Sequence, residues 1–395
     1  MRTVTKFLAA GLLFTGCFAF VNINSYAIEN KVEWDSAFYS KDPLLNDLGD
    51  YPGDEYAWHG HYWLRAYVSM AQTYNDTSYL DKAVKLIDTM FYYRDDVRKS
   101  RGEFNIMDSP YVSAPQYYIN NRSKAAPGWS RLWDNERRIE VITDGQIVQA
   151  IMRFVDLVHS NSDFSAYRDK ANEYIPKVEE TVSLHDSSFV YNRYSDVPGS
   201  YYFPRTDGTG LYSTDVPFNQ SATMGVALLL LDKSKGGGTE YVNKAKAILG
   251  YWKMHRREVD DQAYDWNYYL RDSTDEDVNH GHIDLSFINM AYKSGLVSSS
   301  EMVKLANTLT KKMYKGDGSV SNYVDGSGSE DNLPVGFDWI DLTEFDPDVL
   351  NIAKEVYAKN YSPPTWSRPF LGWAEILRWA AQLKKPIPPK GLRIK

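Results

Sequence analysis

The sequence has 395 residues, of which 24% are charged and 43% are hydrophobic, which excludes both a disordered and a membrane-embedded chain. Its net charge of −8 and its lack of a Lys/Arg run argue against a nucleic-acid partner, because such binding depends on clustered cations. The 30 Tyr, 16 Phe and 11 Trp residues are an unusually high aromatic content, which suits stacking against sugars.

The N-terminal segment is typical of an export signal. Two cations precede an apolar stretch, and Ser25-Tyr26-Ala27 forms a small-x-small cleavage site. We expect residues 1–27 to be a signal peptide, and residues 28–395 to form one secreted or periplasmic catalytic domain. A lipoprotein anchored at Cys17 is the alternative, because Thr15-Gly16-Cys17 resembles the end of a lipobox.

The only cysteine of the chain, Cys17, lies inside that segment. A mature chain without cysteine has no disulfides and no thiol-based zinc site. No other apolar run approaches the ~18 residues that a membrane span needs, so we expect no span.

A repeated pattern, Tyr-x-(Asp/Asn)-Lys-Ala, begins at Tyr79, Tyr167 and Tyr241 and opens a segment with helical apolar spacing each time. Each segment follows a more apolar helical run, as expected of a buried helix. The predicted helical hairpins lie near 58–95, 145–183, 219–256 and 280–314, with weaker ones near 335–359 and 369–384, the last without a clear partner. About six hairpins predict an all-α fold, an (α/α) toroid, with an open solenoid as the alternative.

Long polar and aromatic loops precede the buried helices, at 97–143, 185–218, 257–279 and 315–334. Loops this long in a compact domain are usually functional. Because each one leads into a buried helix, all four meet at one end of the bundle, where we place the site.

Polar and aromatic residues recur where the buried helices begin. These junctions are Trp58-His59-Gly60-His61, Asp144-Gly145, Asn219-Gln220 and Glu276 to His282, with weaker members at Gly336 to Trp339 and Ser367 to Phe370. Helix capping alone would explain some of them. The two His-Gly-His triplets would face each other across the ring, and four imidazoles can bind zinc. Their spacing is not a standard ligand pattern, so we expect no metal.

Two loops concentrate groups suited to catalysis. Tyr264 to Arg271 combines aromatic rings with a cation and is followed by three acids and His280. Trp129 to Arg138 combines carboxylates, cations and two Trp ahead of Asp144. A packed aromatic loop and a surface ion-pair network are the respective structural alternatives.

At these residues the chain resembles the (α/α)-toroid carbohydrate-active enzymes, in particular the secreted bacterial lyases that cleave alginate or glucuronan. The resemblance implies β-elimination on an anionic, uronate-containing polysaccharide without a cofactor. His280 would be the base and Tyr268 the acid, with Tyr264 as its rival. The expected substrate-binding residues are Trp58, His59, His61, Trp133, Glu136, Arg137, Asp144, Gln220, Trp266 and His282.

A lyase also needs a group that offsets the carboxylate charge as the carbanion forms. Asn219 and Arg271 are the expected neutralisers, and Glu276 would orient a His or an Arg. The sequence makes no prediction of oligomeric state.

The main alternative is a glycoside hydrolase on the same fold. It needs two carboxylates about 5 to 10 Å apart, one of them protonated. Four acids are candidates for them: Glu136, Asp144, Glu276 and Asp277. A non-catalytic glycan-binding protein is the third hypothesis, since it would need the stacking rings alone.

Overall fold

The structure is a computed structural model, and it describes residues 27–39, 52–103, 125–133, 136–205, 210–260 and 262–384. The expected signal peptide, apart from Ala27, and Cys17 lie outside these residues. The side chains of residues 132–137 are also outside the description, which includes those of Trp133, Glu136 and Arg137.

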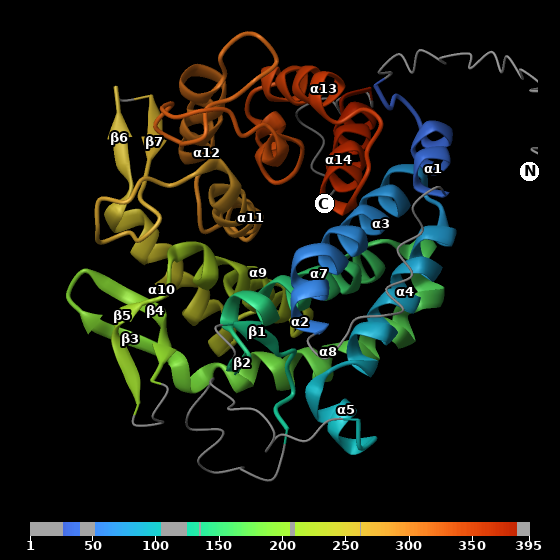
Figure 1. Cartoon of the computed structure of the whole chain (residues 1–395), viewed down its shortest axis with the longest axis vertical. Coiled ribbons are helices and arrows are strands. Elements are labelled where there is room, and N and C mark those ends of the chain that lie inside the picture. The colour runs from blue at the N-terminus through green and yellow to red at the C-terminus, as the bar shows by residue number, and fades with distance from the viewer. Residues whose placement is uncertain are drawn as a thin grey trace, which may run out of the picture.

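Two concentric layers of helices form the body of the molecule (Figure 1). The inner layer is α3 (His61–Tyr74), α7 (Val141–Ser160), α9 (Phe218–Ser234), α11 (Val278–Lys293) and α14 (Ser367–Lys384). The outer layer is α4 (Thr77–Tyr92), α8 (Arg168–Leu184), α10 (Glu240–His255), α12 (Ser299–Asn307) and α13 (Asp348–Asn360). Inner helices such as α9 are buried almost all round, whereas α4 buries one stripe of residues.

The inner helices follow one another around a ring. α14 packs on α3, α3 on α7, α7 on α9 and α9 on α11. The short segment Leu333–Gly336 contacts both α11 and α14 and so closes the circle. The predicted all-α toroid is confirmed, and the open solenoid is wrong.

The fifth predicted hairpin has no inner α-helix. Two 3₁₀ helices, Leu333–Gly336 and Trp339–Glu344, take that place. Between them Asp338 has a φ of +58°, which interrupts helical winding. Gly336 lies against Tyr357 of α13, so closely that a Cβ would be 2.2 Å from its ring. A larger side chain at Gly336 would therefore displace the Tyr357 ring.

The partner of the last helix comes from the other end of the chain. α1 (Lys31–Tyr39) packs on α14, and Trp34 is fully buried there. The Trp34 indole N–H donates to the Phe370 carbonyl at 3.1 Å, and its ring lies 5.6 Å from that of Phe370. The sixth hairpin is therefore completed by residues more than 300 positions away.

We expect Trp34→Phe to lower the free energy of unfolding by about 1–3 kcal/mol, because it removes the donor of a buried hydrogen bond. Val32→Ala is the matched control, since Val32 in the same helix is 72% exposed. Urea unfolding followed by circular dichroism measures both. If the two variants unfold at the same urea concentration, the packing of Trp34 on α14 does not stabilise the fold as we expect.

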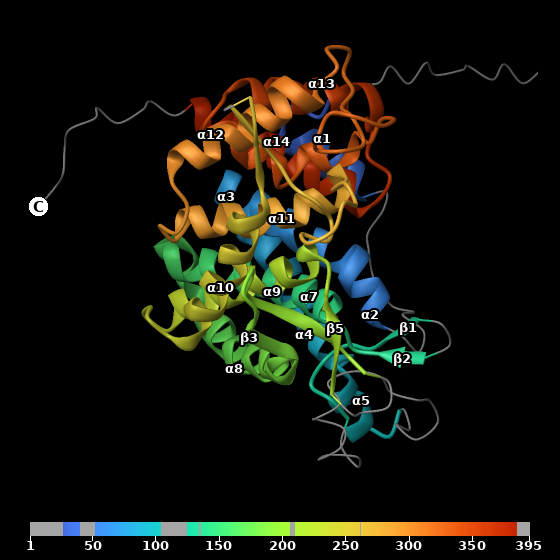
Figure 2. The same cartoon turned by 90° about the vertical axis from the view of Figure 1, so that its left-hand side faces the viewer.

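The loops between hairpins contain small antiparallel sheets that the sequence reading left as loops. They are β1 (Arg131–Trp133) with β2 (Glu136–Arg138), β3 (Phe189–Tyr194) with β4 (Val197–Pro204) and β5 (Leu211–Asp215), and β6 (Arg257–Val259) with β7 (Ala263–Asp265). β1 and β2 extend from the right-hand side of the helical body in Figure 2.

Shorter elements complete the described chain. They are α2 (Pro52–Glu55), α5 (Asp95–Ser100), π-helical turns at Tyr56–Gly60 and Thr308–Met313, and 3₁₀ turns at Ser162–Tyr167 and Asp186–Ser188. In the described ranges, none of the helices has the length and apolar character needed to cross a membrane.

Candidate active site

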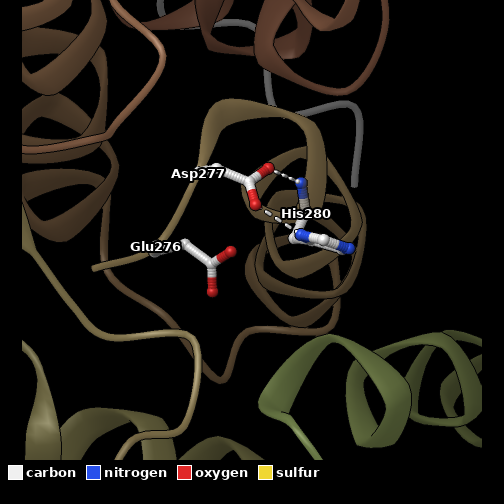
Figure 3. A group of neighbouring side chains, drawn as sticks. All are labelled: Glu276, Asp277 and His280. Atoms are coloured by element: carbon white, nitrogen blue, oxygen red, sulfur yellow. Dashed lines mark hydrogen bonds and ion pairs between the residues drawn. The ribbon is translucent and has the colours of Figure 1, made fainter. Parts of the chain in front are cut away.

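The start of α11 holds a pair formed by Asp277 and His280 (Figure 3). Asp277 is the N-cap of the helix and accepts from the His280 backbone N–H at 2.8 Å. Its other oxygen lies 2.5 Å from His280 Nδ1. Burial raises the pKa of Asp277, but these hydrogen bonds outweigh it and hold the pKa below its ordinary value. Asp277 is therefore ionised at neutral pH.

Glu276, the preceding residue, has the opposite environment. It is fully buried, and neither carboxyl oxygen has a hydrogen bond. Burial, together with the charges of Asp284 and Asp277, raises the pKa of Glu276 well above its ordinary value. The same burial raises the pKa of Asp284 to about 7. Burial thus favours the protonated form of Glu276, directly beside an ionised carboxylate.

Glu276, Asp277 and His280 form a compact group, with one ligand-type atom of each within 4.8 Å of the others. Two carboxyl groups with oppositely shifted pKa values are the arrangement that separates an acid from a base. The group fits a metal poorly, because Asp277 and His280 already bond to each other and burial disfavours the charged form of Glu276.

The four imidazoles do not form a metal site within the described residues. His59 Nδ1 lies 3.4 Å from Ser367 Oγ, and the buried His61 has no hydrogen-bond partner. The two triplets do approach across the ring, because His282 Nε2 lies 3.4 Å from the Tyr62 hydroxyl.

Tyr268 lies against the pair, with its ring centroid 4.8 Å from that of His280. The Phe218 backbone N–H, where α9 begins, donates to the Tyr268 carbonyl at 3.2 Å and so fixes this loop at the ring. Burial and the neighbouring Tyr269 raise the pKa of Tyr268, which keeps its hydroxyl protonated. Two residues that the sequence reading assigned to one site are therefore in contact.

Three other residues of the same loop lie elsewhere. Tyr264 and Trp266 are core residues, and their rings pack on that of Trp252 at 5.8 Å and 6.0 Å. Arg271 is 3.3 Å from an Asp196 oxygen and lies over the Tyr194 ring. Their positions therefore do not support the predicted roles, which were acid for Tyr264, sugar contact for Trp266 and neutraliser for Arg271.

Asp144 is also a core residue. Its carboxylate lies 2.8 Å from His185 Nε2 and accepts from the Trp129 backbone N–H at 3.0 Å. Burial raises the pKa of Asp144, although His185 opposes this. Asp144 therefore orients His185 and does not itself reach the surface.

His185 lines an aromatic pocket of ≈ 330 Å³ between the starts of α7 and α9. The pocket is lined by Arg138, Ile139, Glu140, Val141, His185, Ser188, Tyr201, Tyr202, Phe203, Pro204, Tyr212, Val216 and Gln220. Asn219 and Gln220 each bury a side-chain oxygen that has no hydrogen-bond partner. Burial raises the pKa of Glu140 above its ordinary value, although Arg131 and Arg138 oppose this.

A second pocket, which we call the cationic pocket, adjoins the Asp277–His280 pair. It has ≈ 220 Å³ and is lined by Trp58, His59, Tyr62, Asn279, His280, His282, Ile283, Trp366 and Arg368. Trp58, His59 and His282 are thus placed together with His280, as expected.

Beneath this pocket lies a buried charge network that the sequence reading missed. Arg65 donates to both oxygens of Asp338, at 3.1 Å and 2.7 Å. His282 Nδ1 also lies 3.0 Å from Asp338. His282 and the junction at Gly336 to Trp339 were the sequence signals near it, but the pairing with Arg65 spans 273 residues. Glu140 and His185 were not predicted either.

No family model and no curated protein sequence matches the chain. Among solved structures it is similar to a GH76 α-mannanase of Bacteroides thetaiotaomicron, with a TM-score of 0.49 and 13% identity over 82% of this chain and 86% of that one. It is also similar to an inactive variant of the GH76A α-1,6-mannanase of a Salegentibacter species in complex with α-1,6-mannotriose. The TM-score is 0.46 and the identity 12%, over 83% and 90% of the two chains.

As a correction to the sequence analysis, the similar structures are named as α-mannanases, which are glycoside hydrolases, and not as the expected alginate or glucuronan lyases. Arg271, the expected neutraliser of a uronate, forms an ion pair with Asp196 instead.

Proposed function

We propose that this protein is a glycoside hydrolase in which Glu276 and Asp277 are the acid and the base or nucleophile. One observation carries the proposal: two carboxyl groups whose pKa values are shifted in opposite directions lie within 4.8 Å of each other at the loop end of the toroid. Glycosidic hydrolysis requires this combination.

The separation favours a retaining mechanism. Inverting enzymes leave about 6.5–9.5 Å between the carboxyl groups for a water molecule, whereas retaining enzymes leave about 5–5.5 Å. The Asp277 carboxylate would attack the anomeric carbon while the proton of Glu276 passes to the departing glycosidic oxygen. Water would then cleave the glycosyl-enzyme ester, with Glu276 taking its proton.

His280 would act as a positioning residue for Asp277. Its two hydrogen bonds keep the carboxylate ionised and fix its direction. The Glu276 carboxyl lies beside the pair in Figure 3 but is fully buried. Its proton therefore reaches a substrate only if the side chain turns toward the pocket when a glycan binds, as catalytic contacts often tighten on binding.

The substrate would be a polysaccharide chain lying over the loop end of the ring. The aromatic pocket supplies tyrosine rings on one side, and the cationic pocket supplies Trp58 and Trp366 on the other. The proposal includes export by the signal peptide of residues 1–27, with residues 28–395 acting as one catalytic domain.

The test incubates purified residues 28–395 with α-1,6-mannan and a panel of neutral and anionic polysaccharides. We expect new reducing ends from one polymer, with the anomeric configuration of the first product retained by proton NMR. Glu276→Gln should lack this activity and keep the melting temperature. Products with a new double bond, or an inverted first product, would contradict the assignment of the two carboxyl groups.

A further inference from the structure

The cationic pocket holds an arginine whose charge has no acidic partner. The Arg368 guanidinium lies 5.3 Å, 5.6 Å and 5.7 Å from the ring centroids of Tyr62, Phe337 and Trp366. One terminal nitrogen donates to Asn279 Oδ1, and Nε is buried without a hydrogen-bond partner. Within the described chain, no carboxylate forms an ion pair with it.

Among the described residues, the acids near Arg368 are bonded to other groups or form no ion pair with it. Asp277 is bonded to His280, and Asp338 to Arg65 and His282. Asp331 interacts with Arg368 only at longer range, and burial raises the pKa of Asp331 above its ordinary value. The positive charge of Arg368 is therefore left for a ligand.

Two further features add positive potential and a stacking surface. α11 and α14 both begin at this pocket, and helix N-termini carry partial positive charge and free N–H groups. Trp366 is 38% exposed at the rim, which is unusual for so large a side chain and suits contact with a sugar ring.

We propose that the cationic pocket binds a sulfate or phosphate ester carried by a sugar unit of the glycan. Donors reach the pocket from three elements: His59 before α3, Asn279 in α11 and Arg368 in α14. Donors from several directions match a tetrahedral oxyanion, and arginine binds such groups through two parallel hydrogen bonds. Because His280 borders both the pocket and Asp277, the esterified unit would lie next to the cleaved bond. This assignment rests on the proposed hydrolase for the sugar class.

The test is isothermal titration calorimetry of residues 28–395 with mannose 6-sulfate, mannose 6-phosphate and mannose. We expect at least one ester to bind about 10- to 100-fold more tightly than mannose, and added NaCl to weaken only the esters. The tighter ester identifies the substituent. Arg368→Gln should abolish the preference and Arg368→Lys should keep part of it. Arg168→Gln, an exposed cation of α8, should leave it unchanged.

Equal affinity for mannose and both esters would overturn the proposal, as would a folded Arg368→Gln that keeps the preference. If that variant unfolds, His59→Ala replaces it and should weaken ester binding without changing mannose binding. Because ester binding is measured without cleavage, this experiment tests the pocket independently of the proposed hydrolase activity. A chain that binds esters but hydrolyses nothing contradicts the hydrolase alone, and one that cleaves a neutral glycan without ester preference contradicts the pocket alone.

Discussion

Asp277→Asn is expected to lower kcat by about 10²- to 10⁴-fold, the range for loss of a positioned acid or base. Asparagine is also a good N-cap, so it can still accept from the His280 backbone N–H. The variant should therefore keep the melting temperature while losing the charge. Reducing-end release under substrate saturation measures the effect. Asp275→Asn, an exposed acid two residues away, is the control and should keep full activity.

The pH profile separates this chemistry from a structural effect. The pKa of Asp277 is lowered, so Asp277 stays ionised at pH values below 3.8, the ordinary pKa of an aspartate. The pKa of Glu276 is raised, so its acid form persists above its ordinary value of 4.5. We expect a bell-shaped kcat profile whose alkaline limb lies well above pH 4.5. An alkaline limb that ends near pH 4.5 would contradict Glu276 as the proton donor.

Asp338→Asn should lower the free energy of unfolding by about 3–5 kcal/mol, because it strands the guanidinium of Arg65 in the protein interior. Arg65 is only 5% exposed, and its two bonds to Asp338 go to the two carboxyl oxygens. Asparagine tolerates the φ of +58° at this position, so the substitution changes charge with little added backbone strain. Denaturant unfolding measures the loss, and Asp169→Asn on the surface should change it by less than about 0.5 kcal/mol.

A double variant shows whether the loss of stability comes from the unpaired charge of Arg65 or from another effect of the substitution. Arg65→Met together with Asp338→Asn should recover part of the loss, since no unpaired charge remains. A double variant no more stable than Asp338→Asn would contradict this explanation.

The same network makes stability depend on pH. Burial lowers the pKa of His282 to about 4, below its ordinary 6.5, so the fold disfavours its protonation and loses stability as pH falls from about 6.5 toward 4. Arg65 and His282 hold the pKa of Asp338 far below its ordinary 3.8 despite burial. The stabilisation that ionised Asp338 provides is fully present above pH 3.8 and is lost as the pH falls below that value. Stability should therefore decline steadily on acidification.

The sequence by itself determined the repeating hairpins and the end of the ring that carries the site. The apolar period of a helix is local, and so is the junction at which each buried helix begins, as Asp277 and His280 illustrate within three residues of one another. The contact of Tyr268 with His280 also lies within one loop.

Only the tertiary structure decided which polar residues meet across the ring. Asp338 binds Arg65 from 273 residues away, and Trp34 completes the last hairpin from 336 residues away. The same packing buried Tyr264 and Trp266 and paired Arg271 with Asp196. Burial and long-range partners set the charge of a carboxyl group, and neither is encoded in spacing along the chain. For this reason Glu276 and Asp277, neighbours of nearly the same chemistry, differ in protonation only once the chain is folded.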